Sequence, residues 1–337
     1  MKPVRIVQFG IGPIGAAIAR LVADRPGLVL VGGVDIDPSK VGKDLGDVAG
    51  IGRQIGVPVT ATLRGALMRQ QADLVLHSTQ SFFSAFKPQI LEILDNELDV
   101  ISTAEELSFP WEKHSGEAKE IDAAAKLKGK RVLGTGVNPG FLLDTLPLTV
   151  TAICRRVDSM RLERRVDASK RRRPFQAKIG CGLSVEEFRL RMSEGGIGHV
   201  GLEESAGMIL DCLKMRPDRS ESTIEPVIAS TQLRTSFFNI EPGQVAGLQQ
   251  VLKVYIGSKE FLRLSFQAAV GLASEKDTIR IEGDPDLDLE LAGANGDAGT
   301  PGIVVNAIPR VLRSTPGLLT MKDLQVVSAW SGMPEGS

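Results

Sequence analysis

The sequence is poor in the residues that most often build metal centres, disulfides and aromatic clusters. Its 337 residues include three cysteines and three histidines, and aromatic residues make up 4%. Cys154, Cys181 and Cys212 show no C-x-x-C spacing, and no H-E-x-x-H or comparable ligand motif occurs. We therefore expect no metal and no disulfide scaffold, as in a reduced cytoplasmic protein.

The chain also lacks a charge excess and a long apolar run. Forty Lys and Arg stand against 41 Asp and Glu, so a net charge of -1 gives no reason to expect nucleic acid or a membrane surface as partner. No apolar run approaches the ~20 residues of a membrane span, and the N-terminal apolar stretch lacks a signal-peptide cleavage site. Hydrophobic residues, at 42%, are numerous enough for real cores.

The first half of the chain alternates apolar strands with helical segments. Continuous apolar runs are typical of strands buried on both faces of a parallel sheet. The strand patterns cover residues 4–10, 28–35, 72–79, 98–103 and 131–136. Such alternation predicts right-handed β-α-β crossovers and a doubly wound parallel (Rossmann) sheet over residues 1–145.

The second half reads differently, because apolar and polar residues alternate with period two. This pattern indicates strands with one face in water, so residues 146–300 are predicted to form an α+β domain on a largely antiparallel sheet. The strands are expected at residues 160–167, 251–257, 261–267, 278–283 and 287–291. The C-terminal segment, residues 301–337, contains a helical pattern within residues 302–320 and is expected to pack back on the first domain.

The first strand leads into a glycine motif, "GIGPIG". Gly10 permits a tight turn, Gly12 lets backbone N–H groups approach a pyrophosphate, and Gly15 lets the following helix pack close to the strand. Pro13 and Ile14 open that helix, whose N-terminus attracts phosphate. We expect all five residues to bind a dinucleotide; the alternative is a strand-to-helix turn with no ligand.

Asp35 follows the second strand and is the expected partner of a ribose 2′-OH. A carboxylate repels a 2′-phosphate, which favours NAD over NADP. The same segment also contains Ser39, Lys40 and Lys43, and a lysine that folds toward a 2′-phosphate would admit NADP. The cofactor is therefore expected to be NAD or NADP, with NAD preferred.

Short polar turns follow the other strands at the same edge of the predicted sheet. Ligands of doubly wound sheets bind beyond the carboxyl ends of the strands, although each turn taken alone is also compatible with ordinary loop chemistry. The expected cofactor contacts in these turns are Ser78, Thr79, Gln80, Thr103, Asn138, Pro139 and Gly140.

The segment "STAEELSFP" places two adjacent carboxylates just after an apolar strand. Desolvation raises a carboxyl pKa and makes the group usable in proton transfer. We expect Glu105, which is closer to the strand end, to be the catalytic group, and Glu106 is the second choice. The alternative is a pair of solvated carboxylates at the start of a helix.

Histidines and one basic run are the remaining candidates. His77 is expected to be a satisfied core residue and His114 a surface residue, whereas His199 follows glycines and is a candidate substrate contact. Residues 170–173 contain Lys170 and Arg171–Arg173. They are expected to form an exposed basic loop, with a carboxylate- or phosphate-binding loop as the alternative.

Several longer stretches resemble a known family. They are "GIGPIG", "VDIDPSKVGKDLG", "STAEELSFP", "GTGVNPGF", "RRRPFQAKIGCGLSVEEF", "GHVGLEES" and "EPGQVAGLQQ". The chain resembles the 2,4-diaminopentanoate dehydrogenase and native amine dehydrogenase family, within the dihydrodipicolinate reductase-like Rossmann oxidoreductases. It has no paired histidines and no Ser-Gly-Thr loop, which argues against dihydrodipicolinate reduction itself.

The resemblance implies reversible oxidative deamination of an amine or diamino acid with a nicotinamide cofactor. It implies that Glu105 lies near the reacting nitrogen, that ammonia and a ketone are the products, and that the protein is a homodimer. Phe141 and Phe175 lie beside the motifs and are expected to limit substrate size. The alternatives are an imine or carbonyl reductase and a non-catalytic dinucleotide sensor.

Overall fold

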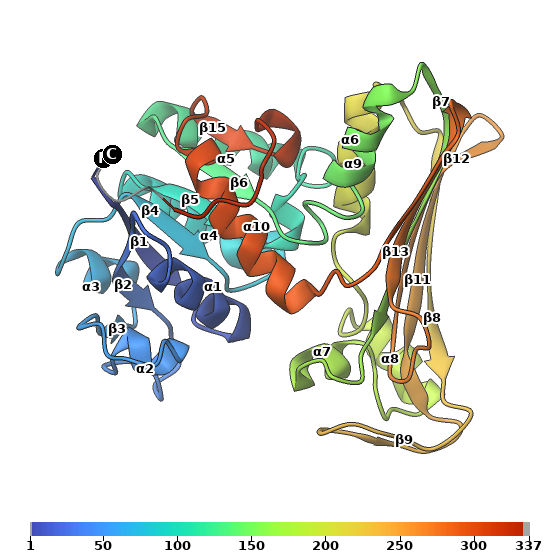
Figure 1. The fold of residues 1–337 in the computed structure, drawn as a ribbon, viewed down its shortest axis with the longest axis horizontal. Coiled ribbons are helices and arrows are strands. Elements are labelled where there is room, and N and C mark those ends of the chain that lie inside the picture. The colour runs from blue at the N-terminus through green and yellow to red at the C-terminus, as the bar shows by residue number, and fades with distance from the viewer. Residues whose placement is uncertain (1, 333–337) are drawn as a thin grey trace. The chain divides into compact units, whose positions relative to one another are not determined.

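The computed structural model describes residues 2–332, which divide into two compact units. One unit comprises residues 2–141 and 295–332, and the other comprises residues 142–294. The sequence placed these divisions at 145 and 300, and residues 333–337 of the predicted C-terminal segment lie outside the described residues. Figure 1 shows a sheet in each unit.

The first unit is built on a seven-stranded parallel sheet in the order β15-β6-β5-β4-β1-β2-β3. This order confirms the predicted doubly wound sheet and places β1 and β4, where the winding reverses, beside each other. The strands are β1 (Val4–Phe9), β2 (Leu28–Val34), β3 (Val59–Thr60), β4 (Leu74–His77), β5 (Asp99–Ser102), β6 (Arg131–Gly134) and β15 (Gly317–Leu319).

Helices of the first unit carry apolar stripes onto this sheet. In α4, Phe83, Phe86 and Ile90 recur at helical spacing and are at most 2% exposed. The burial of these side chains anchors α4 from its first turn. The helices are α1 (Pro13–Ala23), α2 (Leu45–Ala49), α3 (Leu63–Leu67), α4 (Phe83–Asp95), α5 (Ser115–Lys128) and α10 (Gly296–Val311).

The second unit contains a six-stranded sheet in the order β14-β13-β7-β12-β11-β8. All neighbouring strands are antiparallel except β7 and β12, which are parallel, so the prediction of a largely antiparallel sheet is confirmed. The strands are β7 (Arg156–Asp167), β8 (Arg219–Ile228), β11 (Val245–Ile256), β12 (Lys259–Ala269), β13 (Lys276–Asp284) and β14 (Leu287–Leu291). A separate ribbon pairs β9 (Leu233–Arg234) with β10 (Asn239–Ile240).

One face of the six-stranded sheet packs on the helices of its own unit. Along β12, Leu262, Leu264 and Phe266 point into this core and are at most 4% exposed. Arg263 and Gln267 alternate with them on the other face and are only half-buried. The helices are α6 (Thr145–Val150), α7 (Arg173–Lys178), α8 (Val185–Ser193) and α9 (Leu202–Leu213), and Figure 1 shows α6, α7 and α9 on one side of the sheet.

Candidate functional site

The three glycines of the loop between β1 and α1 are required for different reasons. Gly10 has φ +85°, and a Cβ there would lie 2.4 Å from the Ser78 carbonyl oxygen. A Cβ on Gly15 would lie 1.9 Å from the Gly10 carbonyl oxygen. Gly12 differs, because a Cβ there would meet nothing within 4 Å. The fold therefore requires Gly10 and Gly15, while the space beside Gly12 is open to a ligand.

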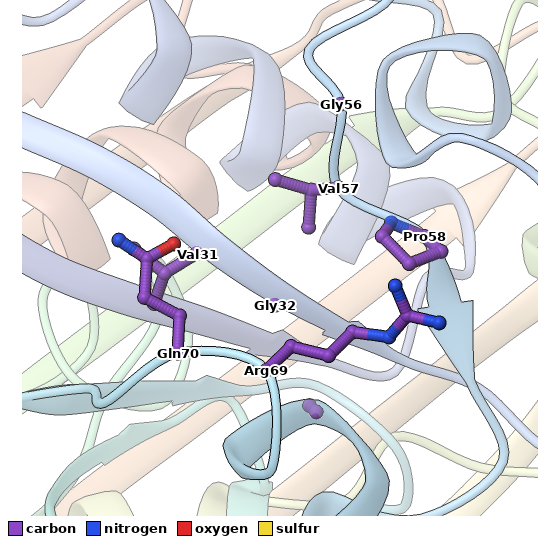
Figure 2. A pocket seen from close by; sticks show the side chains of 8 residues that line it. Val31, Gly32, Gly56, Val57, Pro58, Arg69 and Gln70 are labelled. Atoms are coloured by element: carbon purple, nitrogen blue, oxygen red, sulfur yellow. The ribbon is translucent and has the colours of Figure 1, made fainter.

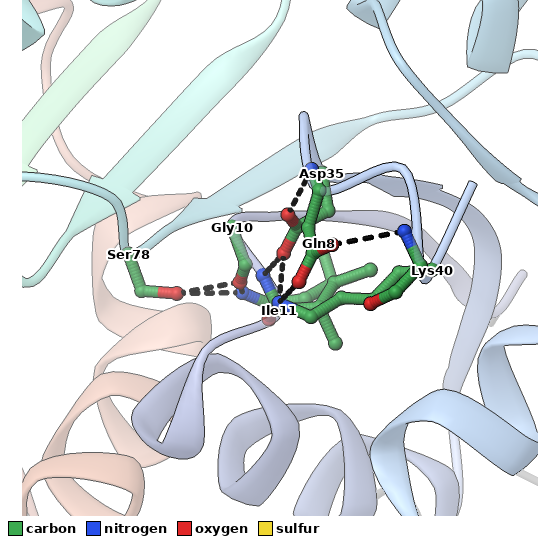
Figure 3. A network of polar contacts seen from close by, with 8 residues as sticks. Gln8, Gly10, Ile11, Asp35, Lys40 and Ser78 are labelled. Atoms are coloured by element: carbon green, nitrogen blue, oxygen red, sulfur yellow. Dashed lines mark hydrogen bonds and ion pairs between the residues drawn. The ribbon is translucent and has the colours of Figure 1, made fainter.

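A hydrogen-bonded ring holds this loop in place (Figure 3). Gln8 Nε2 donates to the Gly10 carbonyl and to Ser78 Oγ, both at 2.9 Å, and Ser78 Oγ donates to the same carbonyl at 2.9 Å. Helix α1 follows with Pro13 at its first position and no side-chain cap on its N-terminus. The first-turn N–H groups of such a helix have no intrahelical acceptor and attract anions. Gln8 was not found from the sequence, because a polar residue in an apolar strand carries no motif.

Asp35 follows β2 directly, and its carboxylate turns toward the glycine loop (Figure 3). It accepts hydrogen bonds from Ile11 N at 2.8 Å, from Asp37 N at 2.9 Å and from Lys40 Nζ at 2.8 Å. Burial by itself would raise the pKa of Asp35, but these donors outweigh it and hold the pKa below the ordinary value. Asp35 is therefore ionised at neutral pH, with its charge partly balanced by Lys40.

The other expected cofactor residues follow β4, β5 and β6 at the same edge of the sheet. Thr79 Oγ1 bonds to His77 and Gln89, Gln80 is exposed, and Thr103 N donates to the His77 carbonyl at 2.9 Å. After β6, Asn138–Pro139 is a cis peptide and Gly140 has φ +121°. The parallel strands thus bring these turns to the same edge as Gly10 and Asp35.

The two candidate carboxylates have different environments on the 3₁₀ turn Glu105–Leu107. Glu106 is 3% exposed and accepts from Phe83 N at 2.6 Å and from Lys113 Nζ at 2.5 Å, while His114 Nε2 lies 3.2 Å away. Burial alone would raise the pKa of Glu106, yet these groups lower it. The carboxylate of Glu106 is therefore occupied by contacts that hold the turn.

Glu105 is half-buried, and between residues 2 and 332 its carboxylate has no hydrogen bond or ion pair. The turn that carries it packs directly on β6, since a Cβ on Gly134 would lie 2.3 Å from the Leu107 carbonyl carbon. Of the two adjacent carboxylates, Glu105 is the one whose oxygens remain open to a substrate.

Two predictions about exposed residues are wrong. His114 was expected on the surface, but its ring stacks on Phe83 at 4.5 Å and contacts Glu106. Arg171 was expected in an exposed loop, but it is 8% exposed and its guanidinium lies 4.4 Å from the centre of the Phe175 ring. In both cases an aromatic neighbour buries the polar side chain, which the local charge pattern does not reveal.

The expected substrate residues lie in different surroundings. The His199 ring stacks on Phe266 at 4.4 Å, and its backbone N–H donates to Gln250 Oε1 at 2.8 Å. Burial, with the charges of Lys178 and Arg164, lowers the pKa of His199 to about 3, so the ring is neutral at pH 7. Phe141 and Phe175 are each half-buried.

A cavity of about 180 Å³ has no residue of the glycine loop in its lining, and Figure 2 shows the residues that line it. It is lined by Val31 and Gly32 in the middle of β2 and by Ala66 of α3. Its polar side chains, Arg69 and Gln70, are exposed. Because no buried polar group points into it, we assign no ligand to this cavity.

Residues 2–332 contain neither a metal-binding cluster nor a membrane-spanning helix. No group of three or more His, Cys, Asp or Glu side chains is arranged to hold a metal ion. None of the helices in that range has the length and apolar character needed to cross a bilayer.

The comparisons with known proteins cover both units. The family model described as 2,4-diaminopentanoate dehydrogenase C-terminal domain matches residues 141–335, and the model of the dihydrodipicolinate reductase N-terminus matches residues 4–88. A 2,4-diaminopentanoate dehydrogenase from Acetoanaerobium sticklandii is 31% identical, covering 98% of this chain and 96% of that protein. An amine dehydrogenase from Streptomyces virginiae is 25% identical, covering 94% and 95%.

A solved structure gives the same picture of the fold. The amine dehydrogenase from Mycobacterium smegmatis matches with a TM-score of 0.89 at 23% identity, covering 98% of both chains. The doubly wound sheet with its glycine loop shows a Rossmann-type fold, and the relatives identify the chain as an oxidoreductase. The chain belongs to the 2,4-diaminopentanoate dehydrogenase family, which confirms the resemblance found in its sequence.

Proposed function

We propose that this enzyme catalyses the reversible oxidative deamination of an amine or diamino acid, such as 2,4-diaminopentanoate, to a ketone and ammonia. The observation that carries the proposal is the pair of carboxylates on the 3₁₀ turn. Glu106 is bound by Phe83 and Lys113, while Glu105 has no partner among residues 2–332 and lies on a turn at the carboxyl edge of the sheet. The names of the relatives support an amine as substrate.

The loop between β1 and α1 fits a nicotinamide dinucleotide. The space beside Gly12 and the uncapped start of α1 suit a pyrophosphate, and Asp35 is placed to accept hydrogen bonds from a ribose. Asp35 repels a 2′-phosphate, but Lys40, which now pairs with Asp35, would attract one. We propose that NAD is preferred and that the Asp35–Lys40 pair sets the preference. Ser78, Thr79, Gln80, Thr103, Asn138, Pro139 and Gly140 are proposed as further contacts.

The bound nicotinamide supplies the hydride acceptor, and the chain supplies proton transfer and orientation. Glu105 first accepts a hydrogen bond from the substrate ammonium and takes its proton, which frees the nitrogen lone pair. Glu105 then releases this proton to solvent and is a carboxylate again. When the C–H bond has lost its hydride, water adds to the substrate iminium carbon and gives its proton to Glu105. Glu105 returns that proton to the nitrogen, and the C–N bond breaks as the hydroxyl proton leaves, which releases ammonia and the ketone.

Substrate selection is proposed to depend on the second unit and on Phe141. Phe175 and His199 offer apolar ring surface, and His199 is neutral at pH 7. Arg171 has a fixed position over Phe175 and is a candidate partner for a substrate carboxylate, which would select amino acids over simple amines.

We also propose a cytoplasmic homodimer that forms through the helix-free face of the six-stranded sheet. On β7, Glu163 and Arg165 lie on this face at alternate positions, and Arg165 Nε is buried with no hydrogen-bond acceptor among residues 2–332. A second copy lying across the face can pair these opposite charges reciprocally, as a two-fold interface requires. Arg165→Glu is expected to convert the dimer to monomer in analytical ultracentrifugation, whereas the exposed Arg189→Glu in α8 is the matched control.

The test mixes the enzyme with NADH or NADPH and a panel of small ketones and 2-amino-4-oxopentanoate, with and without ammonium. We expect oxidation of the cofactor only when ammonium is present. Oxidation that is independent of ammonium would make the enzyme an imine or carbonyl reductase. Cofactor binding with no oxidation of any kind across the panel would favour a dinucleotide sensor.

A further inference from the structure

A buried polar network joins three elements, β4, β5 and α4. His77 Nδ1 lies 2.8 Å from Ser102 Oγ, and His77 Nε2 lies 2.7 Å from Gln89 Oε1. Thr79 Oγ1 lies 2.9 Å from His77 Nε2 and 2.6 Å from Gln89 Oε1. His77 and Ser102 are 0% exposed. These four residues, here named the His77 network, tie the ends of β4 and β5 to α4.

The acceptors and donors in the His77 network fix the direction of every hydrogen bond. Gln89 Oε1 only accepts, so His77 Nε2 carries the proton and donates it. His77 Nδ1 then has a lone pair, which accepts from the Ser102 hydroxyl. Burial lowers the pKa of His77 to about 4, which keeps the ring neutral and maintains this arrangement at pH 7. The network is therefore fully satisfied and rigid.

The network continues into the turn that carries Glu105. Ser102 Oγ accepts from Ala104 N at 3.1 Å, and Ala104 is the residue on which the 3₁₀ turn begins. The far side of the turn is held separately, since Glu106 accepts from Phe83 N. Glu105 thus lies between two anchors, and the first of them leads to His77.

The His77 network also extends to the expected cofactor-binding turn after β4. Thr79 follows Ser78, whose hydroxyl donates to the Gly10 carbonyl of the glycine loop. The Thr79 hydroxyl donates its hydrogen bond to Gln89 Oε1. The Thr79 oxygen keeps a lone pair, which is able to accept from a hydroxyl of a bound ribose.

We propose that His77 is a positioning residue, which through Ser102 and Ala104 fixes the turn of Glu105 relative to the cofactor-binding turn at Thr79. The inference rests on the proposed function, because it assigns a catalytic carboxylate to be positioned. His77 transfers no proton and touches no reacting atom. Its effect is geometric, and a displacement of about 1 Å at a reacting group costs up to about a hundredfold in rate.

Three variants distinguish the contact of His77 with Gln89 from its contact with Ser102. His77→Asn places an amide oxygen near the position of Nδ1 and keeps the acceptor for Ser102. His77→Gln reaches the position of Nε2 and keeps the donor to Gln89, but leaves Ser102 without its acceptor. Ser102→Ala removes the link to Ala104 outright. Ser159→Ala is the matched control, because Ser159 is a buried serine, 3% exposed, that bonds to Glu282 in the other unit.

Three quantities are measured for each variant. The first two are kcat with ammonium and ketone, and the Kd of NADH. The third is amide hydrogen exchange in the peptide spanning residues 103–108, which contains the turn. We expect His77→Gln and Ser102→Ala to lose kcat about tenfold or more, with Kd within about twofold and faster exchange in this peptide. His77→Asn and Ser159→Ala should stay within about threefold of wild-type kcat, with unchanged exchange.

The double variant His77→Gln/Ser102→Ala should be no worse than either single variant, because both break one chain of contacts. Equal losses in His77→Asn and His77→Gln, or wild-type exchange in residues 103–108, would overturn the inference. If wild-type enzyme shows no ammonium-dependent turnover, the proposed function fails. Hydrogen exchange then still decides whether His77 holds the turn.

Discussion

Gly12 and Gly15 differ in a way that separates folding from ligand binding. A Cβ on Gly15 would lie 1.9 Å from the Gly10 carbonyl oxygen, well inside an ordinary contact of 3.4 Å, whereas a Cβ on Gly12 would meet nothing within 4 Å. Gly15→Ala is therefore expected to disturb the fold. Gly12→Ala should leave the fold nearly intact and obstruct a pyrophosphate beside the loop.

The expected magnitudes follow from these distances. Gly15→Ala forces the backbone apart by more than 1 Å, an overpacking that costs about 1–3 kcal/mol. At about 2–4 °C per kcal/mol for a unit of this size, Tm falls by about 2–12 °C. Gly12→Ala costs less than about 1 kcal/mol, through a poorer helix N-cap. Its Kd for the dinucleotide should rise at least about tenfold, which corresponds to about 1.4 kcal/mol.

The assay combines thermal unfolding with titration of NADH and NADPH followed by fluorescence. Gly302→Ala is the control, because Gly302 lies inside α10 with nothing within 4 Å of a Cβ. Gly302→Ala should raise the free energy of unfolding by about 0.5–1 kcal/mol and bind the cofactor with the wild-type Kd. If folded Gly12→Ala binds both dinucleotides as tightly as wild type, the pyrophosphate does not lie beside Gly12 and the assignment of the loop is wrong.

Three further predictions concern charge. Asp35→Asn should shift the ratio of NADPH to NADH affinity at least about tenfold toward NADPH, and Lys40→Ala should shift it the other way; unchanged ratios in titrations would dissociate this pair from cofactor choice. Burial lowers the pKa of His77 to about 4 from 6.5, so the unfolded chain takes up a proton before the folded one and stability falls as pH drops between these values. The free energy of unfolding falls by about 3 kcal/mol over this range, and His77→Gln should flatten this part of the Tm–pH curve. A Tm–pH curve for His77→Gln identical to that of the wild type would contradict the assignment of this pH dependence to His77. Arg164 donates to Asp277 at 2.8 Å and both are nearly buried, so Arg164→Met should cost about 3–5 kcal/mol in denaturant unfolding, and Arg164→Met/Asp277→Leu should recover most of it.

The fold was predictable where burial imposes a regular pattern. The continuous apolar strands of the first unit and the period-two strands of the second follow from which faces are buried. Strand β8 was missed because most of its residues are exposed, so no apolar alternation marks it. Strand β15 was missed because it has three residues and exists through its pairing with β6.

The candidate site was predictable only in part. The glycine spacing is recognisable in the sequence because the backbone conformation of the loop requires glycine at Gly10 and Gly15. Asp35 is recognisable from its position directly after the second strand. The distinction between Glu105 and Glu106 depends on which side of a 3₁₀ turn meets Lys113 and Phe83, and sequence order alone does not contain that information. Gln8 carries no signal at all, since its role arises from the loop that folds over it.

The central claim, that Glu105 is the proton-transferring carboxylate of an amine dehydrogenase, is tested most directly by one rate. Glu105→Gln and the exposed Glu117→Gln of α5 are compared for ammonium-dependent oxidation of NADH or NADPH with a ketone that wild type accepts. We predict a loss of at least about a hundredfold in kcat for Glu105→Gln, with cofactor affinity preserved, and wild-type rates for Glu117→Gln. Wild-type turnover by Glu105→Gln would contradict the account.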